Sequence, residues 1–451
     1  MSQSPAETAA AIERWLDQHH ITEIECLIPD MAGQARGKIV PRHKYKPGAG
    51  LRLPEAVLCM SVTGDYPEED FTSVADPDMR LVPDGSSVRP VPWAKEPTAQ
   101  IIHDCERFDG SAVDLSPRHV LKRILKCYEQ EGWAPIVAPE MEFYLVQVEP
   151  DEDIPLKPPI GRTKRTEAGM QSFSIDSVNE YDDIFDVMYD WCEAQGIQLD
   201  TLIHEMGTAQ MEINLDHGEP LALADQVFLF KRTIREVAIR HQMYATFMAK
   251  PMQGQPGSAM HLHHSVVDMK TRQNIFSLGD GGESDSFRHF IGGLQKYLPA
   301  ATLFFAPYVN SYRRLSRYTS APINLQWGYD NRTCGLRVPH ADPQDRRVEN
   351  RLAGVDVNPY LVMAVSLACG YLGMKEGCVP SQPLAGSAYE QPQQLPTHMD
   401  DAIDKLRRCE PLAELFGSHF IETYCAIKAS EYHEFFEVIS PWERRHLLLN
   451  V

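Results

Sequence analysis

The segment APEMEFYL at residues 138–145 carries two carboxylates inside an otherwise apolar run. Because side chains alternate between the two faces of a β-strand, Met141, Phe143 and Leu145 would face one way. Glu140 and Glu142 would face the other way. Adjacent carboxylates repel each other, and removing them from water is costly. The segment therefore predicts a strand with one face in the core and the other toward a group that stabilises negative charge.

Four later segments repeat this placement of charged or imidazole side chains in strand-like sequence. A lone glutamate on a strand usually faces solvent, and a lone histidine is more often a hydrogen-bonded core residue than a ligand. Five such segments in one chain favour a shared polar site. The side chains concerned are Glu140, Glu142, Glu205, Glu212, His261, His263, Arg337, Arg347, Glu349 and Arg351.

The chemistry of this set favours hard cations and phosphate. Several carboxylates with one or two imidazoles suit magnesium or manganese, whereas zinc would prefer more histidine or cysteine. Bound cations would keep paired carboxylates ionised. Arginines beside such cations are a common way to hold polyphosphate during phosphoryl transfer. The chain has no GxxxxGK[ST] loop, no GxGxxG and no kinase motif, so ATP would be held by metals and arginines.

The net charge and the cysteine content of the chain limit the kinds of partner and compartment it can have. A formal net charge of −20 argues against nucleic acid and is compatible with cationic ligands, although an ordinary acidic cytosolic protein would look the same. The ten cysteines form no CxxC pair, which predicts reduced thiols and a cytoplasmic location. The first twenty residues predict an amphipathic helix rather than a signal peptide. The apolar run at 360–374 is short for a membrane span and predicts a buried helix.

The 451 residues are enough for one large or two ordinary domains. Near residue 110 the sequence changes from short strand-like pieces with proline-rich turns to helical segments, which predicts a domain boundary there. Before it, a strand, a turn at Met31–Gln34 and a second strand are expected. After it, Ser116 and Pro117 predict the start of a helix that ends near Gln130. Residues 376–400, rich in proline, glutamine, glycine and serine, predict a loop. Further helices are expected at 181–195, 220–242, 286–300, 357–375 and 400–410.

Five ordered motifs, spread over nearly the whole chain, resemble the glutamine synthetase family. APEMEFYL resembles its PEPEFF-type strand, and HEMGTAQME resembles its HHE…GQxE segment. KPMQGQPGSAMHLHHS resembles KPxxGxxGSGMHxHxS, and PYVNSYRRL resembles NSYKRL. NRTCGLRVP followed by RRVENR resembles NRSASIRIP and RRIExR.

The resemblance implies an α+β fold with an N-terminal helix at 1–19 and a small β-grasp domain at 20–108. A large α/β catalytic domain at 109–451 would follow, with a curved antiparallel sheet lining the site. It also implies a homo-oligomer of twelve subunits in two hexameric rings, in which each active site is completed by the neighbour's small domain.

The resemblance also implies roles for individual residues. The ligands of the metal that clamps glutamate would be Glu142, Glu205 and Glu212. Those of the metal among the ATP phosphates would be Glu140, His261 and Glu349. Arg314, Arg351 and Gly257 would bind glutamate, and His263 and Ser265 the nucleotide. Arg332, Arg337 and Arg347 would face the phosphates. The implied reaction is phosphorylation of the γ-carboxylate of L-glutamate by ATP, followed by attack of an amine on the acyl phosphate.

The departures from the family concern the ammonium site. Ser320, in SRYTSAPIN, stands where ammonia-using members have a loop glutamate. The DGSS signature is absent, and Asp65 is the nearest candidate for its aspartate. DMAGQARGK at 30–38 resembles the opening of γ-glutamylpolyamine synthetases and their relatives.

These departures predict a ligase that joins glutamate to an organic amine, either a polyamine or a monoamine. Glu212 or a neighbour's Asp65 would serve as the base. The alternatives are an ammonia-using glutamine synthetase, a related ligase for another acid or amine, and a catalytically silent homologue. The silent homologue is disfavoured because idle buried carboxylates are costly.

Overall fold

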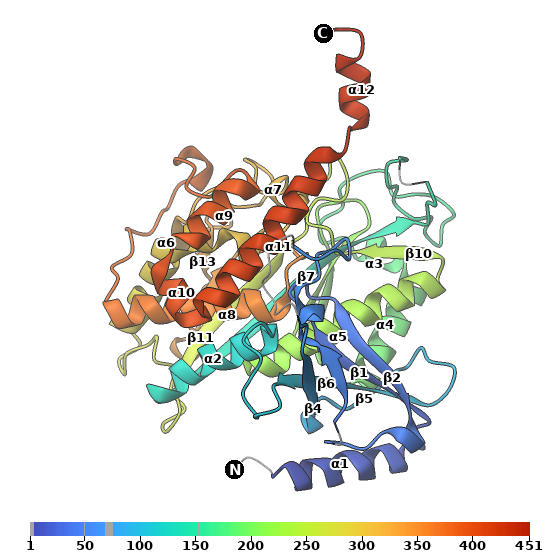
Figure 1. Cartoon of the computed structure of the whole chain (residues 1–451). Helices are drawn as coiled ribbons and strands as arrows, with labels where there is room; N and C mark the ends of the chain where they lie inside the picture. The colour runs from blue at the N-terminus through green and yellow to red at the C-terminus, as the bar shows by residue number, and fades with distance from the viewer. Residues whose placement is uncertain (1–3, 49, 68–74, 152) are drawn as a thin grey trace.

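The computed structural model describes residues 4–48, 50–67, 75–151 and 153–451 and builds two sheets with a thick layer of helices (Figure 1). Helix α1 (Pro5–Gln18) begins at Ser4, whose hydroxyl accepts from the Glu7 amide while the Glu7 carboxylate accepts from the Ser4 amide. This reciprocal pair is a capping box. The predicted N-terminal helix is therefore confirmed, and it buries Ile12 and Leu16 against the first sheet.

The first sheet has the strand order β2-β1-β6-β4-β3, with β5 on β6. Strands β1 and β2 form the expected antiparallel hairpin, and β1 runs parallel to β6. The strands are β1 (Glu23–Pro29), β2 (Ala35–Pro41), β3 (Arg52–Pro54), β4 (Asp78–Pro83), β5 (Arg89–Pro90) and β6 (Thr98–Glu106).

The second sheet has the order β12-β13-β14-β11-β7-β9-β8, with β10 also on β7. Its pairs are antiparallel, as predicted, except for β12 and β13, which run parallel. The strands are β7 (Trp133–Gln147), β8 (Leu199–His204), β9 (Gln210–Leu215), β10 (Met243–Thr246), β11 (Met260–Asp268), β12 (Trp327–Tyr329), β13 (Leu336–Val338) and β14 (Val348–Asn350).

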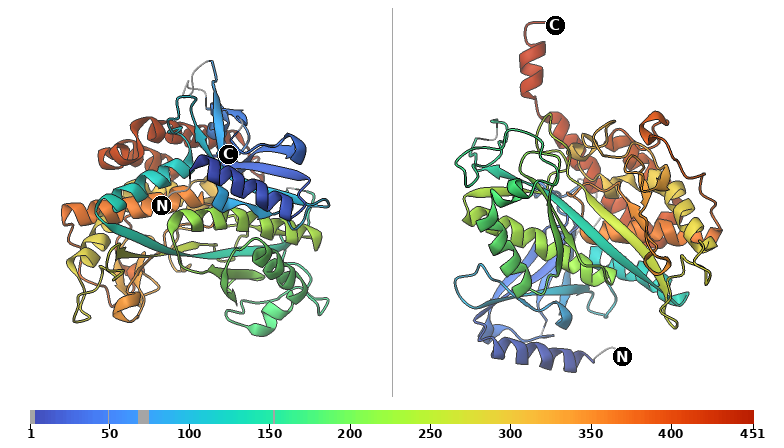
Figure 2. Two further views of the ribbon diagram at one scale, coloured as in Figure 1. Left: turned by 90° about the horizontal axis from the view of Figure 1, so that it is seen from below. Right: turned by 180° about the vertical axis from the view of Figure 1, so that it is seen from behind.

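One face of the second sheet is covered by helices, which leaves the other face for the site. Helices α2 (Pro117–Gln130) and α5 (Pro220–Arg240) pack against β7, and both lie along the same side of the sheet (Figure 2). Met141, Phe143 and Leu145 are fully buried on that side, as the alternation predicted. Burial of such side chains contributes about 1.5–3 kcal/mol each. Glu140 and Glu142 consequently project from the opposite face.

The expected helices are present, with three corrections. Ser116 lies at the N-cap of α2, but its side chain makes no capping hydrogen bond there. The helix expected at 286–300 is α6 (Asp285–Phe305), which extends to Phe305, contains Pro299 and packs on α8 (Pro359–Glu376). A Cβ on Gly293 would lie 2.5 Å from the Gly373 Cα atom, so both glycines permit this approach. The helix expected at 400–410 ends at Arg407.

The other helices follow the predicted positions or complete the C-terminal layer. The loop expected at 376–400 occupies most of the stretch between α8 and α9. No helix of the described residues is long and apolar enough to cross a membrane. The remaining helices are α3 (Ile175–Asn179), α4 (Asp182–Ala194), α7 (Val309–Tyr312), α9 (Met399–Arg407), α10 (Glu410–Phe416), α11 (Ser418–Glu437) and α12 (Pro441–Leu447).

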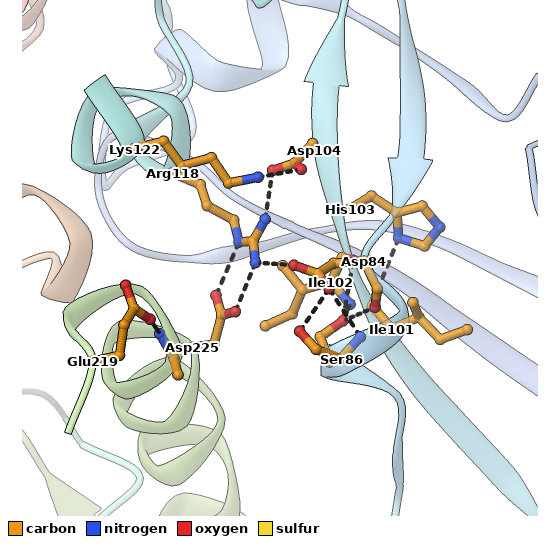
Figure 3. Close-up of polar contacts among 12 residues, drawn as sticks. Asp84, Ser86, Ile101, Ile102, His103, Asp104, Arg118, Lys122, Glu219 and Asp225 are labelled. Atoms are coloured by element: carbon orange, nitrogen blue, oxygen red, sulfur yellow. Dashed lines mark hydrogen bonds and ion pairs between the residues drawn. The ribbon is translucent and has the colours of Figure 1, made fainter. Parts of the chain in front are cut away.

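A buried arginine joins the first sheet to the helices of the second (Figure 3). Arg118 on α2 donates to Asp104 on β6 at 2.5 Å and to Asp84, just after β4, at 2.5 Å. It also donates to both oxygens of Asp225 on α5, at 3.1 and 2.8 Å. Although burial opposes it, the Arg118 and Lys122 cations hold the pKa of Asp104 down, at about 2. The cluster ties both parts of the chain together.

Apolar packing also crosses between the two parts. Leu27 and Ile102 of the first sheet belong to the same buried cluster as Leu121 of α2 and Phe143 of β7. The predicted boundary near residue 110 falls between β6 and α2. The division of the chain into domains and the β-grasp assignment stay predictions.

Candidate active site

The register of the second sheet gathers the predicted carboxylates. Glu142 on β7 pairs with Glu212 on β9, and Glu140 on β7 pairs with His261 on β11. Glu205 follows the end of β8, and its amide donates to the Gln210 carbonyl across the turn that leads into β9. Strand alternation and antiparallel pairing therefore bring side chains that are far apart in sequence onto one patch of the polar face.

The first candidate metal group consists of Glu142, Glu205 and Glu212, whose oxygens approach within 4.8 Å of one another. Burial and the neighbouring Glu205 carboxylate raise the pKa of Glu142 to about 8. Burial and the three neighbouring carboxylates raise the pKa of Glu212 to about 10. These carboxyls consequently favour the protonated form unless a cation lies among them.

The second candidate group surrounds Glu140. Its two oxygens lie 3.0 Å from His261 Nδ1 and 2.8 Å from His263 Nε2. Glu349 on β14 lies 3.8 Å from the same His261 nitrogen. Although burial opposes it, the Arg351 guanidinium holds the pKa of Glu349 at about 2. The predicted set Glu140, His261 and Glu349 is therefore brought together. His263, predicted as a nucleotide contact, also lies within ligand distance of Glu140 and Glu349.

The donor atoms fit magnesium or manganese. The first group offers only carboxylate oxygens, the second offers carboxylates with the imidazoles of His261 and His263, and no cysteine belongs to either group of described residues. Hard divalent cations prefer such oxygen-rich sets. In the first group the three carboxylates face one another, and the pKa of Glu142 and of Glu212 is raised accordingly. A cation between them would neutralise that repulsion.

Buried arginines flank the carboxylates. Arg314 is 3% exposed and donates to the carbonyl oxygens of Leu352 at 2.8 Å and Arg351 at 3.0 Å. Arg351 forms an ion pair with Glu349, which also accepts from Arg337 at 2.7 Å. Beside them, a Cβ on Gly257 would lie 2.6 Å from the Arg314 side chain, so this position requires glycine. Arg314, Arg351 and Gly257 are thus neighbours, as the substrate-binding prediction requires.

Two cavities meet at this patch. The first, of about 340 Å³, is lined by the whole first metal group, by Glu140 and His261 of the second, and by Arg314, Arg332, Arg351 and Ser320. The second, of about 750 Å³, is lined by His263, Ser265 and Arg347. Glu140, Asn214 and Arg337 line both cavities. Two reactants held in the two cavities would therefore meet beside the carboxylates.

One predicted residue lies away from the cavities of its own chain. Asp65 is exposed directly after a turn at residues 62–64, and its amide donates to the Ser61 hydroxyl at 3.0 Å. The Val62 amide of this turn donates to Glu431 on α11. The prediction assigns Asp65 to a neighbouring subunit's site, and it stays a prediction.

Sequence patterns missed several residues that line the cavities. Ser172, Phe173 and Met206 border the first cavity, and Asp216 and His217 border the second. None lies in a strand with alternating charged and apolar side chains, the pattern that marks the other site residues, and Phe173 and Met206 lie in loops. A clue for Met206 was its place directly after Glu205.

Comparison with known proteins agrees with this geometry. The family model for the glutamine synthetase catalytic domain matches residues 114–447. The chain belongs to the glutamine synthetase family. It is accordingly an ATP-dependent ligase of that family, and the predicted glutamine synthetase fold is confirmed. Enzymes of the family use ATP and divalent metal ions, for which the two carboxylate groups provide ligands.

Relatives include ligases for organic amines and for ammonia. Gamma-glutamylputrescine synthetase PuuA of Escherichia coli (strain K12) is 32% identical, covering 97% of this chain and 94% of that protein. Glutamate–isopropylamine ligase of Pseudomonas sp is 29% identical, covering 98% of each. Glutamine synthetase of Pyrococcus abyssi is 30% identical, covering 94% of this chain and 92% of that protein. A solved structure described as "Apo GmaS without ligand" has a TM-score of 0.83 at 27% identity, covering 97% of this chain and 99% of that chain.

Proposed function

We propose that this family member joins the γ-carboxylate of L-glutamate to an organic amine, with ATP as the phosphoryl donor. One observation carries the choice of an organic amine over ammonium. Among the described residues, every carboxylate that lines the first cavity belongs to a candidate metal group. Ser320, beside Thr319 and Ala321, lines this cavity at the position where ammonia-using members carry a glutamate. Among the described residues, no carboxylate of this cavity is thus left over to capture a small cation.

The metal ligands keep the roles that the family resemblance implies. Glu142, Glu205 and Glu212 would hold the metal that clamps glutamate, and Glu140, His261 and Glu349 the metal among the phosphates. Bound magnesium or manganese would supply charge neutralisation for the reacting carboxylate and phosphate oxygens. The mutual proximity of these carboxylates, and the raised pKa of Glu142 and Glu212, support the assignment.

The arginines would orient the two reactants. Arg314 and Arg351, with the backbone at Gly257, would bind the carboxylates of glutamate. Arg332, Arg337 and Arg347 would contact the phosphates, with His263 and Ser265 toward the nucleotide. The meeting of the two cavities at Arg337 supports this arrangement, since it would bring the γ-phosphate beside the γ-carboxylate.

The reaction would proceed in two displacements. A γ-carboxylate oxygen of glutamate attacks the γ-phosphorus of ATP, and ADP leaves. The amine nitrogen then attacks the acyl carbon, loses a proton and expels inorganic phosphate. The guanidiniums of Arg332 and Arg337 would stabilise negative charge on the transferred phosphoryl group. Glu212 or a neighbouring subunit's Asp65 would accept the amine proton, because an alkylamine arrives protonated at neutral pH.

The test is phosphate release from ATP and glutamate across a panel of acceptors. The panel contains ammonium, ethanolamine, putrescine, spermidine and simple alkylamines. We expect kcat/KM for at least one organic amine to exceed that for ammonium by about tenfold, equivalent to roughly 1.4 kcal/mol of transition-state binding. If ammonium is the best acceptor by the same margin, the chain is an ammonia-using glutamine synthetase instead.

The C-terminal segment supports assembly into a larger particle. Helix α12 projects away from the body of the chain (Figure 1). It and its flanks expose apolar side chains, among them Phe436, Ile439, Trp442 and Leu449. Exposed apolar surface of this kind usually becomes buried in a partner. We propose that it packs on other copies of the chain in a double ring of twelve.

Light scattering should give the mass of twelve chains of 51.0 kDa, and deletion of residues 438–451 should give smaller particles.

The cysteines support a reducing, cytoplasmic location. All ten are free thiols in the structure. Such cysteine usage is typical of cytosolic proteins rather than of secreted ones.

A further inference from the structure

An exposed aromatic residue stands at the border of the first cavity. Phe173 lines this cavity, is 66% exposed and has a φ of 63°. A bulky residue in this left-handed region is strained, and such strain persists only where surrounding contacts impose it. The Phe173 amide donates to the His204 carbonyl at the end of β8, at 2.8 Å. The backbone of the segment 167–173 is thereby fixed against the strand that leads to Glu205.

A second contact anchors the same segment through Glu167. One Glu167 oxygen accepts from the Ala209 amide at 2.7 Å and lies 3.1 Å from His204 Nε2. The other ring nitrogen of His204 lies 2.7 Å from the Glu205 carbonyl. Ala209 also has a positive φ, of 55°, so Glu167 stabilises the strained turn between Glu205 and Glu212. Glu167 therefore links the Phe173 segment to both metal-ligand strands.

The wall that results is apolar and borders the charged side chains of the cavity. Phe173, Ile203 and Met206 border the cavity next to Glu205, and Ser320 and Ala321 also line it. The phosphates offer these side chains only polar or charged groups, and glutamate offers two methylene groups between charged ends. Of the proposed reactants in this cavity, an organic amine can offer the longest alkyl chain. An aromatic face also attracts an alkylammonium cation.

We propose that Phe173 is a specificity-determining residue that contacts the hydrocarbon part of the acceptor amine, and that Glu167 is the positioning residue that holds it there. This inference rests on the proposed glutamate–amine ligase function. It favours amines with at least a short alkyl chain over ammonium and methylamine, because each methylene group placed against the wall leaves water.

The full chain with Mg²⁺ is tested with hydroxylamine, methylamine and butylamine as acceptors. Hydroxylamine has no alkyl part, so γ-glutamyl hydroxamate formation reports the acyl phosphate chemistry alone. We expect Phe173→Ala to lower the ratio of kcat/KM for butylamine to that for methylamine by about tenfold, the effect of two or so methylene groups. Phe173→Leu should restore most of that ratio. Phe108→Ala, which changes an aromatic that is 57% exposed and lies outside both cavities, is the matched control.

Variants of Glu167 distinguish a role in positioning Phe173 from a role in the general stability of the chain. Glu167→Gln should raise the KM for butylamine several-fold while the KM for ATP and the hydroxylamine rate stay near their wild-type values, and Glu167→Asp should restore part of the loss. An unchanged butylamine-to-methylamine ratio in Phe173→Ala would overturn the inference while the proposed function stood. Equal losses with all three acceptors would also overturn it. A wild-type chain that forms no hydroxamate would overturn the proposed function itself.

Discussion

Glu142 and Glu212 lie directly opposite each other on β7 and β9, so two carboxylates are paired across the central sheet. Like charges in this relationship destabilise a sheet. Both are buried, and the pKa of Glu142 is raised to about 8 and that of Glu212 to about 10. In the metal-free chain these groups therefore retain protons at pH values where a glutamate in an unfolded chain has lost them. Protons and a divalent cation compete for the same oxygens.

The first prediction concerns stability and pH. An acid whose folded pKa is raised contributes stability that is complete below its unfolded pKa and is lost as pH rises toward the folded value. With EDTA, the melting temperature should therefore fall between pH 5 and pH 8, the window set by the ordinary value of 4.5 and the value of about 8 for Glu142. Mg²⁺ should raise the melting temperature more at pH 8 than at pH 6. Equal increments at both pH values would contradict this competition.

The second prediction concerns turnover and the second candidate group. Glu349→Ala removes a carboxylate that pairs with Arg337 and Arg351 and lies beside His261. We expect kcat to fall on the order of a hundredfold, since losses of this size follow from disturbing metal ligands and their supports. Glu142→Ala should lose as much. Glu236→Ala, which removes an exposed carboxylate paired with Arg240, is the control and should retain wild-type turnover. Full activity of the wild type after exhaustive chelation would refute the metal assignment.

The strands and their polar faces could be predicted because alternation is a local property of sequence. The pattern in 138–145 was sufficient to assign Met141 to the core face and Glu142 to the opposite face, and the structure confirms both positions, with Glu142 lining the first cavity. The parallel pairing of β12 with β13 could not be predicted, because these strands have three residues each and carry almost no pattern. The Arg118 cluster was also missed, since its three aspartates come from segments far apart in the sequence.

The site was predictable in its charged part and not in its apolar part. Carboxylates and arginines in strands are conspicuous, whereas Phe173 is one exposed aromatic in a loop, and only the fold brings it to the cavity. The position of His263 shows a second limit. Its predicted role was nucleotide binding, yet its ring lies 2.8 Å from Glu140, a distance that sequence spacing does not give.

The third prediction concerns the buried Arg118, which is 1% exposed and pairs with Asp84, Asp104 and Asp225. Arg118→Met leaves three carboxylates without their common cation, and breaking a buried ion pair in this way costs about 3–5 kcal/mol. Denaturant unfolding should show that loss. Arg240→Ala, at an exposed i,i+4 pair with Glu236, should cost less than about 1 kcal/mol. Similar losses in the two variants would show that the Arg118 cluster does not join the two parts of the chain.

The fourth prediction concerns Arg337, which donates to Glu349 at 2.7 Å and to Asp330 at 3.0 Å and lies where the two cavities meet. Arg337→Lys keeps the charge but cannot reproduce a guanidinium fork. We expect kcat to fall by more than the KM for ATP rises, because contacts to the transferred phosphoryl group should strengthen in the transition state. Steady-state kinetics at saturating glutamate and amine would measure both values. An unchanged kcat would remove Arg337 from the phosphate site.

The last prediction concerns Ser320, which lines the first cavity in a left-handed backbone conformation with a φ of 59°. Ser320→Glu adds a carboxylate at the cavity border and reduces the space for an alkyl chain. A negative charge there should capture ammonium, which lacks any hydrocarbon part to contact Phe173. We therefore expect the ratio of kcat/KM for ammonium to that for the best organic amine to rise by about tenfold, or roughly 1.4 kcal/mol.

Ser320→Gln, with nearly the same volume as glutamate and no charge, separates the effect of the charge from the effect of the lost space. It should weaken use of the organic amine without improving use of ammonium, because only the charged side chain attracts the small cation. If both variants leave the ratio unchanged, Ser320 does not select the acceptor, and selection against ammonium must come from elsewhere in the cavity.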